Sequence, residues 1–559
     1  MELTGAQALL ESLHNEGVDI IFGYPGGVVL PLYDAMFADK RVKHILVRHE
    51  QGAAHAADGY ARATGKVGVC LATSGPGATN LTTGIANAHM DSIPMVAITG
   101  QVATPLLGRD SFQEADVTGI TMPISKHNYL IKKVEDLPRV IKEAFHIARS
   151  GRPGPVVIDI PKDIFTTKFD YKYPDKVDIP SYKPRTEGHP KQISMATKAI
   201  QAAKKPVIYA GGGVISANAA NELKELAEKC NVPVTTTLMG IGAFPETSAL
   251  SLGMLGMHGT AYANYAVTDC DLLIAIGARF DDRVTGHIAK FAPNAKIIHI
   301  DIDPAEIGKN VRVDIPIVGD VKKVLRALID KVGPKEKHVQ WVEQIEEWKR
   351  KFPLAYKQEG GIIKPQYVIE QAHELAKDRD TIIVTEVGQN QMWAAMFYKY
   401  TKPRTWISSG GLGTMGYGLP AANGAQFGRP DALVIDFAGD GSIQMNIQEL
   451  TTAVNNRLPI KIFVLNNCFL GMVRQWQELI YDRHYSHTNL CNNPDLVKIA
   501  DAYGAVGMRV TKPEEVRGAI EKAFAINDRP VLVDFVVAKE ENVFPFVPPG
   551  QAINEMLID

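Results

Sequence analysis

The chain has 559 residues, and its 60 lysines and arginines against 62 aspartates and glutamates leave a formal charge of −2. This length predicts three or four domains, and a hydrophobic share of 45% argues against a disordered, collagen-like or coiled-coil protein. The near-neutral charge provides no basic surface for nucleic acid or an anionic membrane, so neither is expected as a partner.

The cysteines and the first residues favour a reducing, cytoplasmic location. The five cysteines are far apart and lack Cys-x-x-Cys spacing, so no zinc site or disulfide framework is expected. The start of the chain has neither the basic nor the apolar region of a signal peptide. No apolar run approaches the roughly 20 residues of a membrane-spanning helix.

Short apolar runs rich in β-branched residues alternate with helix-like segments, a pattern typical of βαβ units around parallel sheets. In the first third the runs predict strands at 19–23, 44–47, 67–71, 95–99 and 156–160. A second set is expected at 206–210, 233–236, 272–276, 296–300 and 315–318. A third set is expected at 381–385, 405–408, 433–437, 460–465 and 530–536.

The fold class predicted from this order is α/β, with three doubly wound domains that each contain a parallel sheet. Polar stretches without a clear period separate the domains and predict linkers. The predicted parts are an N-terminal domain at 1–165, a linker at 166–190, a central domain at 191–335, a linker at 336–364, a C-terminal domain at 365–540 and a tail at 541–559.

Two polar motifs follow neighbouring predicted strands in the C-terminal domain. The first is Gly439-Asp440-Gly441-Ser442, which opens a predicted helix, and the second contains Asn467. A carboxylate, an amide and a loop carbonyl supply oxygen ligands that suit Mg²⁺ when phosphate oxygens complete the shell. The glycines let the backbone approach a diphosphate, and a helix start offers free N–H groups. Each motif alone is more simply a turn, but together they predict a site for Mg²⁺ and a diphosphate.

This pairing resembles the signature of thiamin-diphosphate (ThDP) enzymes of the pyruvate decarboxylase and acetolactate synthase group. The resemblance implies that Asp440, Asn467 and the carbonyl of Phe469 bind Mg²⁺. It also implies that Glu50, in an Arg-His-Glu run at a strand end of the first domain, pairs with the aminopyrimidine ring of the cofactor. Without the C-terminal motif, an exposed acid at the start of a helix is the simpler interpretation of Glu50.

The same resemblance assigns the other ThDP contacts. Met415, in a glycine-rich run from Gly411 to Pro420, is the bulky residue over which the cofactor bends, and a methionine that merely packs in a loop is the alternative. The remaining implied contacts are Pro25, Asn80, Gly388, Gln389, Asn390, Gly413, Gly439, Gly441 and Ser442.

Further segments narrow the resemblance to catalytic subunits of biosynthetic acetohydroxyacid (acetolactate) synthases. The most restricted are Phe-Asp-Asp-Arg-Val-Thr-Gly, with Arg283, and Gly-Met-Val-Arg-Gln-Trp-Gln, with Met472 and Trp476. In this family the methionine and tryptophan shape the acceptor pocket, where an indole wall favours one extra methylene by about 1–3 kcal/mol. Core packing is the alternative for Trp476, and a solvated ion pair with Asp281 or Asp282 is the alternative for Arg283. The other implied catalytic or pocket residues are Gly27, Val28, Phe112, Gln113 and Lys162.

Biosynthetic members of this family also bind FAD, although their reaction involves no net redox change. The resemblance places the flavin on the central domain, beginning at a Gly-Gly-Gly run that alone is weak evidence for a dinucleotide. The implied FAD contacts are Arg152, Gly211, Gly212, Gly213, Met257, His258, Gly277, Arg279, Asp281, Val284, Asp301, Ile302 and Asp320.

The resemblance covers nearly the whole chain and implies an enzyme that decarboxylates pyruvate and transfers a hydroxyethyl group to pyruvate or 2-oxobutyrate. This is the first common step of valine, leucine and isoleucine synthesis. The family arrangement also implies a homodimer or homotetramer with the cofactor between two subunits, and a separate small regulatory subunit. One departure is Cys468, where the family more often has a polar residue.

Alternatives of two kinds remain. Another ThDP or FAD carboligase, a pyruvate oxidase or a catabolic acetolactate synthase shares the cofactor motif. Trp476 and Arg283 argue against the oxidase and the catabolic enzyme, and Glu50 argues against a glyoxylate carboligase. An NAD-dependent Rossmann protein is the alternative from another class, but it leaves Asp440 and Asn467 unexplained and lacks a convincing G-x-G-x-x-G after the first strand.

Overall fold

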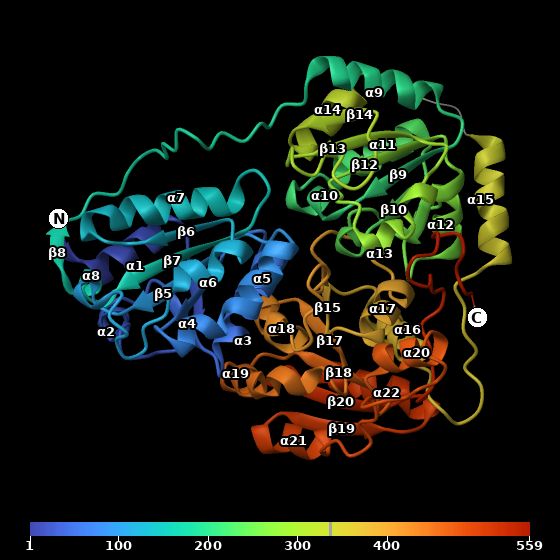
Figure 1. The fold of residues 1–559 in the computed structure, drawn as a ribbon. Helices are drawn as coiled ribbons and strands as arrows, with labels where there is room; N and C mark the ends of the chain where they lie inside the picture. The colour runs from blue at the N-terminus through green and yellow to red at the C-terminus, as the bar shows by residue number, and fades with distance from the viewer. Residues whose placement is uncertain (335–337, 559) are drawn as a thin grey trace.

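The computed structural model describes residues 1–334 and 338–558 and contains three α/β domains (Figure 1). Each domain has a six-stranded sheet in which all strand pairs are parallel, so the expected fold class is confirmed. The predicted boundary at 335 and 336 lies outside the described residues. Within those residues, no helix combines the length and the apolar character needed to cross a membrane.

The N-terminal sheet, on the left of Figure 1, has the strand order β3-β2-β4-β5-β7-β6. Its strands are β2 (Ile20–Gly23), β3 (Lys43–Leu46), β4 (Gly68–Ala72), β5 (Met95–Gln101), β6 (His127–Leu130) and β7 (Pro155–Pro161). Its helices are α1 (Gly5–Asn15), α2 (Leu30–Ala38), α3 (Glu50–Thr64), α4 (Pro76–Asn80), α5 (Thr82–Met90), α6 (Val117–Thr121), α7 (Leu137–Arg149) and α8 (Lys162–Thr166). A short antiparallel pair, β1 (Glu2–Thr4) and β8 (Lys168–Asp170), places a strand inside the segment expected to be a linker.

The central sheet, at the upper right of Figure 1, has the order β11-β10-β9-β12-β13-β14. Its strands are β9 (Pro206–Ala210), β10 (Val234–Thr236), β11 (Ser251–Met254), β12 (Leu272–Ile276), β13 (Lys296–Asp301) and β14 (Ile315–Val318). Its helices are α9 (Pro190–Ala202), α10 (Gly212–Ser216), α11 (Ala220–Cys230), α12 (Ala261–Asp269), α13 (Asp282–Thr285), α14 (Val321–Ile329) and α15 (Val339–Lys351). Although α15 lies in the second predicted linker, it buries Trp341 and Ile345 in the central domain's core.

The C-terminal sheet, below the central domain in Figure 1, has the order β16-β15-β17-β18-β20-β19. Its strands are β15 (Thr381–Thr385), β16 (Trp406–Ile407), β17 (Leu433–Gly439), β18 (Lys461–Asn466), β19 (Val506–Val510) and β20 (Val531–Val536). Its helices are α16 (Pro365–Ala376), α17 (Gln389–Phe397), α18 (Gly418–Gly428), α19 (Leu450–Asn455), α20 (Gly471–Leu479), α21 (Leu496–Tyr503) and α22 (Pro513–Ala525). The prediction of an α-helix after Ser442 is wrong, because Ile443–Glu449 forms a 3₁₀ segment that is interrupted at Asn446.

Every predicted strand is present, with ends within two residues of the expected positions. The strands missed from the sheets are β6, β11 and β19, and each of them lies at a sheet edge. Their side chains are mostly part-exposed, so no continuous apolar run marks them in the sequence.

Counted along the chain, the first and third sheets share the strand order 2-1-3-4-6-5, whereas the central sheet has 3-2-1-4-5-6. The central order is that of dinucleotide-binding proteins. In open parallel sheets, ligands bind beyond the carboxyl ends of the strands where the strand order reverses. This switch point lies between β2 and β4, between β9 and β12, and between β15 and β17.

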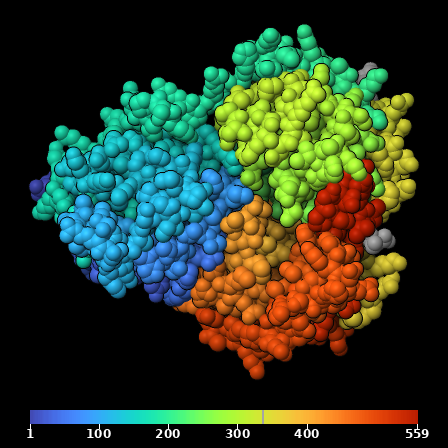
Figure 2. Space-filling view, viewed as in Figure 1, coloured from blue at the N-terminus to red at the C-terminus, as the bar shows by residue number. Residues whose placement is uncertain are grey.

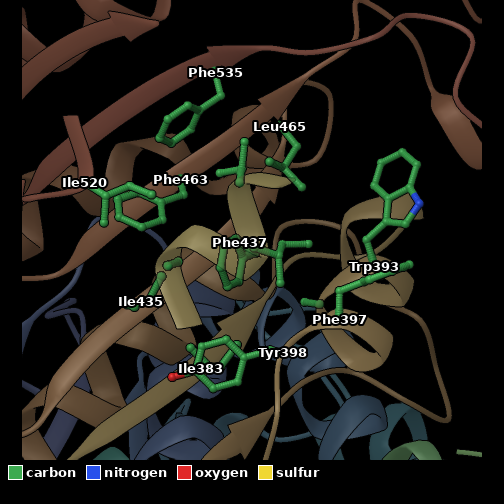
Figure 3. Close-up of a cluster of buried hydrophobic side chains, with 14 of the residues drawn as sticks. Ile383, Trp393, Phe397, Tyr398, Ile435, Phe437, Phe463, Leu465, Ile520 and Phe535 are labelled. Atoms are coloured by element: carbon green, nitrogen blue, oxygen red, sulfur yellow. The ribbon is translucent and has the colours of Figure 1, made fainter. Parts of the chain in front are cut away.

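Buried aromatic side chains fix the strands of the C-terminal sheet (Figure 3). The ring centroids of Phe437 on β17 and Phe463 on β18 are 5.9 Å apart, and those of Phe463 and Phe535 on β20 are 5.6 Å apart. Ile383 on β15 lies in register with Ile435 on β17. This packing holds together the strands whose carboxyl ends carry the loops of the candidate site.

Helices α3 and α18 join the N-terminal and C-terminal domains with almost no side chains between them. A Cβ atom added at Gly424 would lie 1.8 Å from the carbonyl oxygen of Ala56, and one added at Gly59 would lie 2.1 Å from that of Ala421. Only glycine permits backbones to approach so closely. Because α3 begins at Glu50, this contact sets the position of Glu50 relative to the C-terminal domain.

A buried charge network lies at the same interface. Arg62 donates to Asp58 at 2.5 Å and to Asp91 at 2.8 Å, and the hydroxyl of Tyr417 donates to Asp58 at 2.6 Å. Burial disfavours the charged form of Arg62, but the nearby acids outweigh it and hold the pKa of Arg62 well above its usual value. The guanidinium therefore stays charged, since both acids pair with it.

Arg404 connects all three domains. This C-terminal-domain residue donates to the carbonyl of Arg62 at 3.2 Å, to the carbonyl of Ile215 at 3.3 Å and to Asn218 Oδ1 at 2.9 Å. Its φ of 61° places it in the left-handed region, a conformation that a non-glycine residue keeps only where its surroundings hold it.

The C-terminal tail packs across the central domain, as the red segment of Figure 2 shows. The backbone N–H of Val547 donates to the carbonyl of Met257 at 2.8 Å, and that of His287 donates to the carbonyl of Gln551 at 2.9 Å. Phe546 is fully buried.

Two fully buried acids, Glu386 after β15 and Asp436 within β17, face the start of α18. Glu386 Oε2 accepts from the N–H of Gly416 at 2.7 Å, and a Cβ atom on Gly418 would lie 2.5 Å from Asp436 Oδ1. Burial raises the pKa of Glu386 to about 8, and burial together with Glu386 raises that of Asp436 well above its usual value. We therefore expect the pair to hold a proton at neutral pH.

The close contact of α3 with α18 predicts that Gly424→Ala destabilises the protein by about 1–3 kcal/mol, the usual effect of overpacking. Gly518→Ala is the matched control, because a Cβ atom there meets nothing within 4 Å and Gly518 also lies in a helix. Thermal unfolding should show a lower Tm for Gly424→Ala alone. Equal Tm values for the two variants would contradict the backbone contact.

The buried acid pair predicts a pH dependence of stability. Because both folded-state pKa values are raised, the contribution of the pair is complete below the ordinary carboxyl pKa values of about 4 and is lost as pH rises toward 8. Between those values, each proton that the folded state binds in excess of the unfolded state lowers the free energy of unfolding by roughly 1 kcal/mol for each unit that pH rises. Asp436→Asn should flatten the fall in Tm between pH 5 and pH 8.

The exposed Asp34→Asn serves as the control for this change. It should keep the pH profile of the wild type, since its carboxylate is exposed in the folded protein. A profile for Asp436→Asn that runs parallel to the wild-type profile would show that the pair does not hold the proton.

Candidate active site

The loops after β2 and β4 meet at the switch point of the N-terminal sheet. A Cβ atom on Gly26 would lie 2.4 Å from the side chain of Thr73, so these loops touch at Gly26. Gly27 is exposed, and an added Cβ atom there would meet nothing within 4 Å, which leaves its backbone open to a ligand. Pro25 is also exposed, and Val28 packs against β5.

Glu50 is the first residue of α3 and is buried, with 9% of its surface exposed. Asn80 Nδ2 donates to its Oε2 at 3.0 Å, and a Cβ atom on Gly77 would lie 3.2 Å from its Oε1. The interpretation of Glu50 as an exposed helix-start acid is therefore wrong. Its carboxylate is enclosed by the loop and helix that follow β4.

The other residues predicted for the N-terminal half-site differ in their placement. Gln113, with a φ of 60°, packs against Gly75, so it lies at the loop that surrounds Glu50. Phe112 is 89% exposed, and Lys162 is exposed at the start of α8. The structure therefore brings Gln113 to Glu50's loop but leaves Phe112 and Lys162 at the surface.

In the C-terminal domain, the loops after β15 and β17 also meet at the switch point. Gly388, with a φ of 139°, precedes α17, and Asn390 Nδ2 donates to the carbonyl of Phe437 at 2.7 Å. The N–H of Gly439 lies 3.3 Å from its acceptor, Ser442 Oγ. This edge combines a helix start with glycine-containing turns, an arrangement suited to a diphosphate.

Asp440 has the surroundings expected of a cation ligand. Its Oδ1 is buried without a hydrogen-bond partner, whereas Oδ2 accepts from Asn493 Nδ2 at 3.1 Å. Burial raises the pKa of Asp440 to about 7. The backbone of Asn467 lies beside this carboxylate, and Asn467 Oδ1 accepts from the N–H of Phe469 at 3.1 Å. An unpaired buried carboxylate oxygen next to this loop fits a hard cation such as Mg²⁺.

Two amide side chains, those of Gln389 and Gln475, hold Asn467 in position. Gln389 Oε1 accepts from Asn467 Nδ2 at 3.1 Å, and Gln389 Nε2 donates to Gln475 Oε1 at 3.0 Å. Gln389 was predicted to contact the cofactor, and here its side chain positions the predicted metal ligand. Among the described residues, no three His, Cys, Asp or Glu side chains group into a metal site.

The loop that carries Met415 belongs to the C-terminal domain, but hydrogen bonds to the N-terminal domain hold it in place. Both oxygens of Asp91 accept backbone N–H groups, from Gly410 at 3.0 Å and Gly411 at 2.7 Å. Gly413 has a φ of 68°. The Met415 side chain lies 4.0 Å from where a Cβ atom of Gly441 would be, so it faces the Asp440 loop.

Within one chain, the two half-sites are linked indirectly. Glu449 Oε1, from the C-terminal domain, accepts the N–H groups of Arg48 at 3.0 Å and His49 at 3.1 Å, directly before Glu50. No hydrogen bond or ion pair between described residues joins Glu50 to Asp440.

The two restricted motifs, far apart in sequence, meet in space. The Arg283 guanidinium carbon lies 5.9 Å from the ring centroid of Trp476, and Arg283 also pairs with Asp282 at 3.2 Å. Trp476 is part-exposed on α20, so it is not a fully buried core aromatic, and its Nε1 has no partner among the described residues. Met472 packs against the C-terminal core.

The central domain places Gly211, Gly212, Gly213, Gly277 and Arg279 at its switch point, between β9 and β12, but protein contacts account for several of the predicted flavin residues. A Cβ atom on Gly211 would lie 2.2 Å from the carbonyl oxygen of Gly277, and one on Gly213 would lie 2.7 Å from Gly277 Cα. These glycines pack backbone to backbone and do not by themselves indicate a ligand. Gly212 lies beside Met239.

Other predicted flavin residues have similar local roles. Asp281 and Asp320 cap α13 and α14, with Val284 N–H donating to Asp281, and Arg152 donates to Glu306 at 2.7 Å. The tail covers the turn that holds Met257 and His258, whose ring stacks on Phe546. Asp301, Ile302 and Arg279 lie at strand ends on the carboxyl side, and burial raises the pKa of Asp301 to about 6.

Sequence reasoning missed Glu449, Asn493 and Gln475. Glu449 follows a segment in which polar and apolar residues alternate, and Asn493 lies in a polar segment without a motif. Gln475 lies within the restricted Gly-Met-Val-Arg-Gln-Trp-Gln motif, but nothing in the motif marks it as a partner of Gln389. Only hydrogen bonds between residues far apart in the sequence identify them, whereas the glycines beside Asp440 mark its motif locally.

Comparison with known protein families agrees with the three-domain architecture. Models of the thiamine pyrophosphate enzymes match in order: the N-terminal TPP binding domain at residues 3–120, the central domain at 193–328 and the C-terminal TPP binding domain at 386–535. An acetolactate synthase of Mycobacterium bovis is 53% identical over 567 residues, covering 99% of this chain and 91% of that protein.

Two further relatives are of similar length. The acetolactate synthase large subunit of Haemophilus influenzae is 50% identical, covering 100% of this chain and 98% of its own. The acetolactate synthase isozyme 3 large subunit of Escherichia coli is 50% identical, covering 99% and 98%. The chain therefore belongs to the thiamine pyrophosphate enzymes, in the family of acetolactate synthase large subunits.

Proposed function

We propose that this protein is the catalytic subunit of a biosynthetic acetolactate synthase. It decarboxylates pyruvate and joins the hydroxyethyl group to pyruvate or 2-oxobutyrate, at the first common step of valine, leucine and isoleucine synthesis. The observation that carries the proposal is the pair of half-sites at matching switch points, with an enclosed Glu50 in one and an unpaired buried Asp440 oxygen in the other.

Bound ThDP supplies the electron sink on which a 2-oxo acid loses CO₂. Glu50 accepts or shares a proton at the aminopyrimidine ring, and Asn80 holds its carboxylate in position. Met415 would support the cofactor, and the loops after β15 and β17 would hold the diphosphate. Asp440, Asn467 and the Phe469 carbonyl hold Mg²⁺, which keeps Asp440 ionised although burial raises its pKa.

Trp476, Met472 and Arg283 form the acceptor pocket in this proposal. The guanidinium over the indole ring provides a charge for the carboxylate of an oxo acid, while the indole provides an apolar wall. FAD is assigned to the switch point between β9 and β12, since the central sheet has the dinucleotide-binding strand order. The flavin has no redox role in the balance of this reaction.

We also propose a dimer or tetramer of this chain, in which Glu50 of one copy faces Asp440 of another. Glu50 and Asp440 lie in different domains, so a cofactor that touches both must bridge two domains, and the family resemblance places these domains in different subunits. The relatives' designation as large subunits supports a separate small regulatory partner.

The proposed function is tested by measuring acetolactate formation from pyruvate while ThDP, Mg²⁺ and FAD are omitted one at a time. We expect activity with all three cofactors and a loss on omission of each from cofactor-free protein. Full activity without ThDP, or no acetolactate under any condition, would overturn the proposal.

Glu50→Gln should lower kcat by about 10²–10⁴-fold, because the amide cannot exchange a proton with the cofactor ring. ThDP binding should persist, since a Gln oxygen can still accept from Asn80. Glu514→Gln is the matched control, because Glu514 is an exposed acid in the first turn of α22. Full activity of Glu50→Gln in a steady-state assay would remove the assigned role.

Trp476→Leu should lower the preference for 2-oxobutyrate over pyruvate by about tenfold, since the indole contact with one methylene is lost. The measurement is the ratio of the two products when both acceptors compete. Trp348→Leu is the control, because Trp348 is a similarly part-exposed tryptophan on α15. An unchanged ratio for Trp476→Leu would place acceptor selection elsewhere.

A further inference from the structure

Two of the five cysteines lie together beside the predicted metal loop. The segment that follows Asn467 runs antiparallel to residues 488–490: Leu490 N–H donates to the carbonyl of Cys468 at 2.7 Å, and Phe469 pairs with Asn489. This pairing places Cys491 one residue from the position directly opposite Cys468, and the two side chains lie close enough to interact.

Both thiols differ in their surroundings from the other cysteines. Cys491 is exposed and Cys468 is part-exposed, whereas Cys70, Cys230 and Cys270 are buried. The ammonium group of Lys539 donates to Cys491 Sγ at 3.8 Å. An accessible sulfur next to a cation, with a second thiol in reach, is the environment of oxidation-sensitive cysteines.

We propose that Cys468 and Cys491 are a site of oxidation by peroxide, which joins them in a disulfide and weakens binding at the adjacent metal loop. The Cys491 sulfur attacks one oxygen of hydrogen peroxide, so that an S–O bond forms, the O–O bond breaks and water leaves. The Cys468 sulfur then displaces the second oxygen as water. The two thiols lose two electrons and two protons, and peroxide is reduced to two waters.

The consequence for binding follows from the position of Cys468. An S–S bond requires the sulfurs to approach to about 2.05 Å, and Cys468, with a φ of 61°, lies between Asn467 and Phe469. The other strand leads directly to Asn493, which donates to Asp440. Closing the disulfide therefore moves residues on both sides of the cation site. This effect on the metal rests on the proposed function, whereas formation of the disulfide does not.

The test treats the purified holoenzyme with hydrogen peroxide and maps disulfides by peptide mass spectrometry. We expect a Cys468–Cys491 crosslink, with Cys70, Cys230 and Cys270 still free for alkylation after unfolding. After removal of cofactors, the affinity for Mg²⁺–ThDP, measured by calorimetry, should be about tenfold lower in the oxidised protein, as for other disturbances beside metal ligands. Dithiothreitol should restore it.

Cys491→Ser should bind Mg²⁺–ThDP like the reduced wild type and should be unaffected by peroxide, while Cys230→Ser, as the control, should respond like the wild type. Absence of the intramolecular crosslink, or a crosslink without a reversible change in affinity, would overturn the inference. Failure of the reduced protein to bind Mg²⁺–ThDP would instead overturn the proposed function, even if the disulfide forms.

Discussion

The relative position of the domains depends on one buried charge, the guanidinium of Arg62. It lies between Asp58 and Asp91, and removing a partner from such a buried pair typically destabilises a protein by about 3–5 kcal/mol. Asp91 also accepts the backbone N–H groups of Gly410 and Gly411. The same carboxylate thus fixes α3, which begins at Glu50, and the loop that leads to Met415.

The glycine contact between α3 and α18 explains why this network is so tightly constrained. With backbones in contact at Gly59 and Gly424, a shift of α18 toward α3 would force atoms to overlap, and a shift away would separate Tyr417 from Asp58. Glu449 adds a third connection at the first residues of α3. A helix thus carries the position of Glu50 across the domain boundary, and loop flexibility has little influence on it.

Some parts of this fold can be predicted from the sequence and others cannot, and the difference has physical reasons. Strands buried on both faces are continuous apolar runs, so all of them were found, whereas the edge strands β6, β11 and β19 mix polar and apolar residues and were missed. Asp440 is recognisable because its glycine neighbours mark the turn locally. Glu449 has no such local motif, because its role is to accept hydrogen bonds from residues 48 and 49, which helix packing brings close to it.

The same limit applies to the helices and to the central domain. The alanine-rich segment at 51–64 predicts a helix, but small residues do not identify which other helix they contact. The Gly-Gly-Gly run suggested a ligand, yet Gly211 and Gly213 are needed first for contact with Gly277. Strand order, which the sequence does not reveal, is the stronger indication of a dinucleotide site there.

Two sets of buried acids in the C-terminal domain show how position decides the counterpart of a negative charge. Glu386 lies directly after β15 and Asp436 lies within β17, both against the start of α18. The N–H of Gly416 donates to Glu386, neither oxygen of Asp436 has a partner among the described residues, and a proton compensates the pair. Asp440 lies beyond the end of β17, at the switch point, with one oxygen free and amide side chains around it. Glu386 and Asp440 each directly follow a strand, so the difference lies in what faces them: the start of α18 donates an N–H to Glu386, whereas one oxygen of Asp440 remains unpaired beside a loop. The net charge of −2 contributes to neither choice, because each depends on groups within a few ångströms.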